Sequence, residues 1–252
     1  MLILAVETAG PKGGLALVEA RLDAPGDPPR TLALRPLPRQ RTASGSRRRG
    51  HGIELGPGLE DLLREAGVEA AAVKLVAVDI GPGSYTGLRI GVAAAKGFSL
   101  ALGCSLLGLV SLDALAVETI AAESLTETES LAVVIRASAR EAYLGRYRLA
   151  PEERPQRLAD PAIVAYADLQ EILGDPAPRL SGDGAADLAT ALGDPGLATS
   201  VLDASPNVLT IGAEAARLHA EGVRHSTRDI TPLYLRLSEA EEQKRKHTPP
   251  KS

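Results

Sequence analysis

Tryptophan is absent from the 252-residue chain, and phenylalanine, methionine and cysteine each occur only once. Because Cys104 has no second cysteine to pair with, an intrachain disulfide is excluded. Aromatic residues make up 2% of the chain and the net charge is −4, whereas an autonomous nucleic-acid-binding protein needs stacking rings and a basic face. If the protein serves RNA, something else holds the RNA.

Long apolar runs and metal-ligand patterns are also missing. No apolar run reaches the roughly 18 residues that a membrane-spanning helix needs. The first residues, Met1 to Glu7, contain no basic region of the kind that opens a signal peptide. The four histidines, at positions 51, 219, 225 and 247, have no metal-ligand spacing. We therefore expect a cytoplasmic protein with no membrane association and no metal site.

The strongest local pattern is a predicted strand, loop and helix in the first half of the chain. Residues 73–79 form an apolar run that ends at Asp79, and residues 88–102 place small and apolar residues at helical spacing. The loop between them, Gly81-Pro-Gly-Ser-Tyr-Thr-Gly87, contains three glycines. This pattern predicts a buried strand, a tight turn and a helix that is buried on several sides.

The glycine-rich loop has two interpretations. Glycines permit close backbone approach and Ser84 can cap the helix, which suits a purely structural turn. The same features can hold a phosphate at the helix N-terminus. However, the spacing Gly-x-Gly-x-x-x-Gly matches neither the dinucleotide fingerprint nor a P-loop. We prefer the structural turn, and keep as candidate nucleotide-binding residues Glu7, Thr8, Gly81, Gly83 and Ser84.

The order of the elements predicts a duplicated α/β fold of two lobes. The first lobe, residues 1–122, begins with a hairpin of residues 2–6 and 15–18 and a strand at 31–35. A helix follows, with Pro57 near its start, and after the central strand and helix come a strand at 106–110 and a helix from 111. The second, reduced lobe spans 123–237, with strands at 131–135 and 142–149. We expect its helix 206–221 to pack back toward the first lobe and residues 238–252 to form a disordered tail.

A cluster of arginines lies between the third strand and the first helix. It comprises Arg39, Arg41, Arg47, Arg48 and Arg49. Such a cluster can contact phosphate or an acidic partner, but a solvated, mobile loop is the simpler interpretation.

Five segments, in order, closely resemble the bacterial TsaB family, also called YeaZ. They are Ile3-Leu-Ala-Val-Glu-Thr-Ala9, Ile80-Gly-Pro-Gly-Ser-Tyr-Thr-Gly-Leu-Arg-Ile-Gly-Val-Ala-Ala-Ala-Lys-Gly97, Gly108-Leu-Val-Ser-Leu-Asp-Ala-Leu115, Ser181-Gly-Asp-Gly-Ala185 and Pro232-Leu-Tyr-Leu-Arg236. The similarity extends from residue 1 to about residue 237. It implies the actin-like, Hsp70-like ATPase (ASKHA) fold in two lobes.

The resemblance also implies a role in forming threonylcarbamoyladenosine in tRNA. In that pathway the catalytic paralogue TsaD transfers the threonylcarbamoyl group to the adenosine that follows the anticodon, and TsaE is an associated ATPase. TsaB itself is implied to be a non-catalytic subunit without a cofactor. It forms a heterodimer with TsaD, meets TsaE through the complex, contacts tRNA only indirectly and forms a homodimer when alone.

The partner surface of the family is the helix pair at about 55–66 and 87–102. In this chain it maps to Leu59, Leu62, Leu63, Ala66, Leu88, Gly91, Val92 and Ala95. These apolar and small residues can form a four-helix contact with the equivalent pair of a partner, or they can simply cover the chain's own sheet, as part of each helix must.

The chain departs from the family pattern at two places, and one rival function stays open. Family members commonly have Asp-Thr at the end of the first strand and Asp-Ala-Arg at the start of the second lobe, whereas this chain has Glu7-Thr8 and Arg136-Ala-Ser138. The rival is a small-molecule kinase or ATPase of the same fold that uses the Glu7-Thr8 turn and the 81–87 loop. A peptidase is disfavoured because no Ser, His and Asp grouping stands out.

Overall fold

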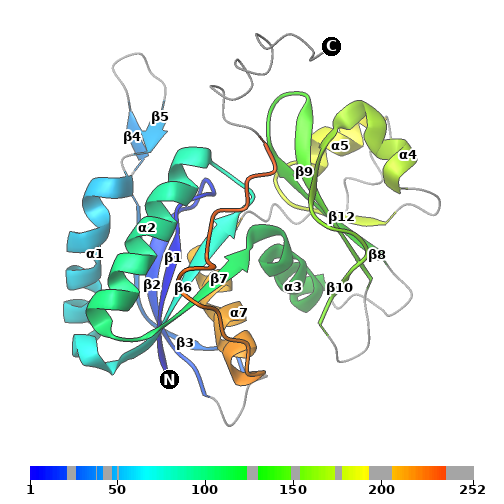
Figure 1. Cartoon of the computed structure of the whole chain (residues 1–252). Helices are drawn as coiled ribbons and strands as arrows, with labels where there is room; N and C mark the ends of the chain where they lie inside the picture. Colours follow the sequence, from blue (N-terminus) through cyan, green and yellow to red (C-terminus); the bar gives the residue numbers. More distant parts are fainter. Residues whose placement is uncertain are drawn as a thin grey trace, which may run out of the picture.

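Two β-sheets, one in each half of the chain, organise the molecule (Figure 1). The structure, a computed structural model, describes residues 1–21, 27–37, 39–41, 47–49, 51–123, 130–148, 154–173, 178–192 and 206–236. The predicted tail at 238–252 and residues 124–129, at the start of the predicted second lobe, lie outside these residues.

The first sheet has the strand order β3-β2-β1-β6-β7. These strands are β1 (Leu2–Glu7), β2 (Gly14–Glu19), β3 (Arg30–Pro36), β6 (Val73–Gly81) and β7 (Ser105–Val110). Strands β1, β2 and β3 form an antiparallel meander, which confirms the predicted hairpin, and β6 and β7 continue the sheet in parallel with β1. Because β1 and β6 are parallel neighbours, their carboxyl ends meet at one edge of the sheet.

Helices cover both faces of the first sheet. On one face lie α1 (His51–Ala66) and α2 (Tyr85–Leu102), and on the other lie α3 (Ser111–Glu123) and α7 (Val208–Ala220) (Figure 1). The two-residue alternation of β1 fills both cores. Leu4 and Val6 pack toward α1 and α2, whereas Ile3 and Ala5 pack toward α7. A short 3-10 helix, η1 (Ala70–Ala72), leads into β6.

The start of α1 differs from the prediction. The helix begins at His51, so Pro57 lies inside it rather than near its first turn. Proline removes one intrahelical hydrogen bond. Leu55, Leu59 and Leu62 are nevertheless buried against the sheet, and their packing outweighs that loss.

The second sheet has the order β10-β9-β8-β12, and β11 pairs with β9 beside β10. The strands are β8 (Ser130–Arg136), β9 (Glu141–Arg148), β10 (Gln156–Arg157), β11 (Ala162–Ala165) and β12 (Arg179–Ser181). One face carries η2 (Tyr166–Asp168), α4 (Leu169–Leu173) and α5 (Ala185–Leu192). Leu112, Leu115 and Ala116 of α3 pack on the other face, so α3 lies between the two sheets (Figure 1).

The arginine cluster falls on a separate antiparallel ribbon, β4 (Arg39–Arg41) and β5 (Arg47–Arg49), instead of an uninterrupted loop. Residues 42–46 between the strands lie outside the described part of the chain. No helix among the described residues is both long and apolar enough to cross a membrane.

Candidate functional site

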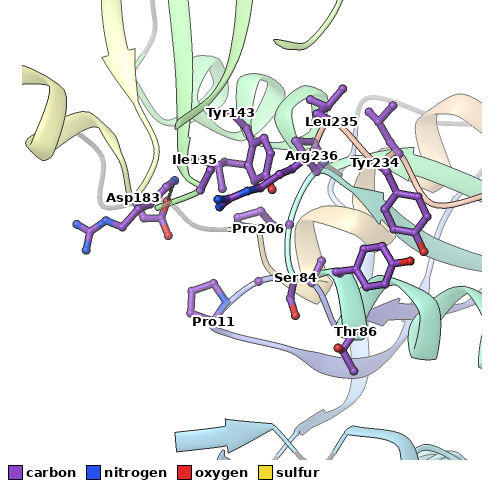
Figure 2. A pocket seen from close by; sticks show the side chains of 18 residues that line it. Pro11, Ser84, Thr86, Ile135, Tyr143, Asp183, Pro206, Tyr234, Leu235 and Arg236 are labelled. Carbon is purple, nitrogen blue, oxygen red and sulfur yellow. Dashed lines mark hydrogen bonds between the residues drawn. The ribbon is translucent and has the colours of Figure 1, made fainter. Parts of the chain in front are cut away.

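A cavity of about 750 Å³ lies where the two lobes meet. The first lobe contributes the turn after β1 and the loop before α2, and the second lobe contributes the ends of β8 and β9 (Figure 2). Its lining includes Pro11, Ser84, Thr86, Ile135, Arg136, Tyr143, Asp183, Pro206, Leu235 and Arg236.

Two buried carboxyl groups lie in the first lobe next to residues that line this cavity. Glu7 ends β1 and Asp79 lies near the end of β6, and both are fully buried. The Glu7 Oε1 accepts a hydrogen bond from the Gly10 N–H at 2.5 Å. Asp79 Oδ1 accepts one from the Gly81 N–H at 2.7 Å, and the Ser111 hydroxyl donates to both Asp79 oxygens at 2.6 and 2.8 Å. The pair therefore joins the turn after β1, the loop before α2 and the start of α3.

Burial raises the pKa of Asp79 to about 6, although hydrogen bonds from Ser111 and Gly81 and the bond to the Glu7 carboxyl oppose this shift. Two adjacent carboxylates repel each other strongly where water does not screen them. The pair therefore keeps one shared proton up to a higher pH than the pH at which a solvent-exposed carboxyl group loses its proton.

Two glycines, Gly87 at the end of the loop motif and Gly91 one turn further along α2, pack closely around Thr8. The Thr8 hydroxyl donates to the Gly87 carbonyl oxygen at 2.7 Å. A Cβ atom at Gly87 would overlap the Thr8 carbonyl oxygen, and one at Gly91 would overlap the Thr8 Oγ1. Gly81 has a φ of 105°, which favours glycine. The Ser84 hydroxyl accepts from the Gly87 N–H at 3.3 Å and caps α2. The geometry thus accounts for the motif as a close contact between α2 and the end of β1.

This packing makes a prediction for two glycines on the same helix. We expect Gly91→Ala to destabilise the fold by about 2 kcal/mol, because the new methyl group displaces Thr8. Gly97 has no neighbouring atom within 4 Å of an added Cβ, so Gly97→Ala is expected to stabilise by up to about 1 kcal/mol through helix propensity. Urea unfolding measures both. Equal effects of the two substitutions would contradict the packing role of Gly91.

The residues predicted for the partner surface divide into two groups. Leu59, Leu62, Leu88, Gly91, Val92 and Ala95 are buried within this chain's own first lobe. Leu63 and Ala66 are partly buried and pack against the same core. The exposed side of α2 is a different one, and it carries Arg89, Ala93, Gly97 and Leu100. Leu100 is 76% exposed, the largest exposed fraction among the large apolar side chains that the structure describes as exposed.

Comparisons with known proteins agree with this architecture. Residues 46–243 match the family model described as TsaD, tRNA N6-adenosine threonylcarbamoyltransferase. An uncharacterised protein of Mycobacterium tuberculosis is 33% identical over 192 residues, which cover 76% of this chain and 78% of that protein. The tRNA threonylcarbamoyladenosine biosynthesis protein TsaB of Bacillus subtilis is 27% identical over 200 residues, covering 77% and 83%.

A crystal structure of a Pseudomonas aeruginosa protein, described as uncharacterised with similarity to peptidase YeaZ, superimposes with a TM-score of 0.68 and 26% identity over 93% of this chain and 99% of that one. A second structure, YeaZ from the same organism, gives a TM-score of 0.67 at 24% identity, with the same coverage. The chain belongs to the TsaB (YeaZ) family. Its fold is the actin-like fold in two lobes, as the resemblance implied.

Seen as a TsaB-family site, the cavity uses few of the predicted nucleotide-binding residues. Gly83 and Ser84 line it, whereas Glu7, Thr8 and Gly81 are buried and do not line it. The glutamate that replaces the family's aspartate at position 7 reaches back to the Gly10 N–H and to Asp79. Its carboxyl group is therefore engaged inside the protein. Within the described part of the chain, no three His, Cys, Asp or Glu residues gather as a metal site.

Several site residues escaped the sequence reasoning. Arg136 and Arg236 line the cavity, and their guanidinium groups pair with Asp187 at 2.7 Å and Glu141 at 3.6 Å. The Asp79–Glu7 pair was also missed, although a signal existed: each acid closes an apolar strand of the first lobe. Only the observed adjacency of β1 and β6 brings the two acids together.

Proposed function

We propose that the chain is a non-catalytic subunit that binds a TsaD-family transferase and holds it in its working form. The family takes part in threonylcarbamoyladenosine modification of tRNA. In this proposal TsaD transfers the threonylcarbamoyl group in the cytoplasm, TsaE joins through the complex, and tRNA contacts this subunit only indirectly. The chain alone forms a homodimer through the same surface.

The main support for this proposal is the exposed side of α2. Small residues at positions 93 and 97 let another helix approach closely, and Leu100 presents an apolar side chain that its own chain leaves 76% exposed. We define this docking face as Arg89, Ala93, Gly97 and Leu100, with Leu63 and Ala66 at its border. The family model that matches this chain is that of the transferase, so the partner is expected to offer an equivalent helix pair.

Leu100→Glu tests the docking face. Burying one leucine contributes roughly 1.5–3 kcal/mol, and burying a carboxylate costs more, so we expect affinity for the TsaD subunit to fall at least about 100-fold. Leu158→Glu is the matched control, because Leu158 is exposed on the second lobe. Isothermal titration calorimetry and light scattering measure affinity and complex size. Unchanged binding of Leu100→Glu would mean that the docking face does not bind the TsaD subunit.

The interlobe cavity supports one alternative, a small-molecule kinase or ATPase. Its volume suits a small-molecule ligand, and two arginines, each paired with a carboxylate, lie at its wall. The alternative predicts ATP hydrolysis by the pure chain above the blank, lost in Glu7→Gln. The inward bonding of Glu7 favours the scaffold role instead, because a cleft acid held by Gly10 and Asp79 is poorly available to a ligand.

A further inference from the structure

Residues 230–236, here called the C-terminal strap, cross from the first lobe to the second (Figure 1). In the first lobe Ile230 is buried in the core beside β7, and the Leu233 N–H donates to the Ile80 carbonyl oxygen at 2.7 Å. On the other side of the cavity Leu235 packs against the apolar cluster that α3 shares with β8 and β9 of the second lobe, and Arg236 pairs with Glu141 of β9 at 3.6 Å. The strap is therefore anchored on both sides of the cavity.

Between these anchors the strap contacts the start of α2. The ring of Tyr234 stacks on that of Tyr85, the first residue of α2, with centroids 4.6 Å apart and an interplanar angle of 27°. Arg89 lies one turn further along the helix. Its guanidinium carbon is 5.4 Å from the Tyr85 ring centroid, and its Nη1 donates to the Tyr85 hydroxyl at 3.3 Å. The contact thus runs from the strap through Tyr85 to a residue of the docking face.

The burial of the tyrosines sets this pair apart. The chain contains five, of which Tyr143, Tyr147 and Tyr166 are buried. The other two, Tyr85 and Tyr234, are 37% and 43% exposed and stack on each other. An aromatic stack contributes about 0.5–1.5 kcal/mol beyond burial, enough to hold the first turn of a helix against fraying.

The strap also forms one wall of the interlobe cavity, where Leu235 and Arg236 lie near Tyr143 of the second lobe (Figure 2). A change in the spacing of the lobes must therefore strain the contacts of the strap on one side of the cavity or the other, the Tyr234–Tyr85 stack among them. The strap is short and anchored at both ends, so it has little slack to absorb such a change.

We propose that the C-terminal strap couples the second lobe to the docking face, by holding the first turn of α2 through the Tyr234–Tyr85 stack. This inference rests on the proposed function for the identity of the face, and it gives the second lobe a role: it sets the position of α2 without touching the partner.

Hydrogen–deuterium exchange of residues 85–92 in the full chain tests the coupling, together with affinity for the TsaD subunit. We expect Tyr234→Ala to speed exchange there about 3- to 10-fold and to weaken binding by a similar factor, whereas Tyr234→Phe, which keeps the stack, behaves as the unmodified chain. Leu235→Ala, which alters the anchor where the second sheet packs on α3, is expected to speed the same amides. Leu158→Ala, on the second lobe but away from the strap, is expected to leave them unchanged.

Three results would overturn the coupling. Unchanged exchange in both alanine variants of the strap would mean that it does not hold α2. Weaker binding of Tyr234→Ala with unchanged exchange would make Tyr234 a direct partner contact only. Faster exchange in Tyr234→Ala but not in Leu235→Ala would mean that the second lobe is not coupled to α2. Failure of the unmodified chain to bind TsaD would count against the proposed function alone, because the exchange measurements do not need the partner.

Discussion

Asp79→Asn is expected to be more stable than the unmodified chain at pH 7.5, by up to about 3 kcal/mol. An asparagine amide can donate to the Glu7 carboxylate, as the shared proton does, while its oxygen still accepts from Gly81 and Ser111. The substitution therefore keeps the hydrogen bonds that join β1, β6 and α3, and removes a charge that burial disfavours.

The size of this effect follows from the pKa of Asp79, which is raised from 3.8 to about 6 chiefly by burial. Because the folded protein holds this proton more tightly than the unfolded chain, the stabilising contribution is complete below about pH 4. It is lost as the pH rises from there to about 6. At 1.36 kcal/mol per pKa unit, the loss is about 3 kcal/mol.

Urea unfolding at several pH values between 4 and 8 measures this effect. The difference in free energy of unfolding between Asp79→Asn and the unmodified chain should grow from pH 4 to about pH 6 and then stay constant up to pH 8. Glu7→Gln, which also removes one charge of the pair, should show the same trend. Parallel pH curves for all three proteins would contradict a shared proton between Glu7 and Asp79.

Glu214→Ala is expected to destabilise the fold by about 3 kcal/mol. Glu214 lies on α7 with only 2% of its side chain exposed, and it pairs with Arg154 and with Arg217, whose Nε is 3.0 Å from Oε2. Arg154 precedes β10, so this ion pair links the second sheet to a helix of the first lobe. Removing the shared carboxylate leaves two arginines without it, and breaking a buried pair costs about 3–5 kcal/mol. Both arginines are partly exposed, which favours the lower end of that range.

Glu221→Ala is the control for this prediction. Glu221 pairs with Arg217 at 2.7 Å, but 45% of its side chain is exposed, so its loss should cost no more than about 0.5 kcal/mol. Chemical unfolding of the two variants at pH 7 gives the comparison. Equal losses would mean that the Glu214 network adds nothing beyond a surface ion pair.

The sequence was sufficient for the fold because its local patterns are strong. The apolar run that ends at Asp79, the glycine-rich loop and the small-residue helix lie in β6, the following loop and α2. Successive side chains of β1 point to opposite faces of the sheet, so Leu4 is buried on one face and Ala5 on the other. The start of α1 was placed wrongly because Pro57 was given more weight than the packing of the helix on the sheet.

The site was less predictable because it depends on how the elements pack. Helical spacing marks Leu59 and Leu88 as apolar but cannot say whether an apolar face meets the chain's own sheet or a partner, and the structure buries both within the first lobe. Gly91 likewise suggests close approach without naming the neighbour, which is Thr8. The contact of Tyr85 with Tyr234 joins residues far apart in the chain, so no local pattern contains it.

Reconstituted threonylcarbamoyl transfer to tRNA tests the central claim most directly. TsaD, TsaE and the enzyme that makes threonylcarbamoyl adenylate, the donor for the transfer, would be assayed without this chain, with it, and with Leu100→Glu or Leu158→Glu. The account predicts transfer that depends on the unmodified chain, persists with Leu158→Glu and falls to the level without the chain with Leu100→Glu. Transfer that proceeds equally well without this chain, or that Leu100→Glu supports fully, would contradict a scaffold role through the docking face.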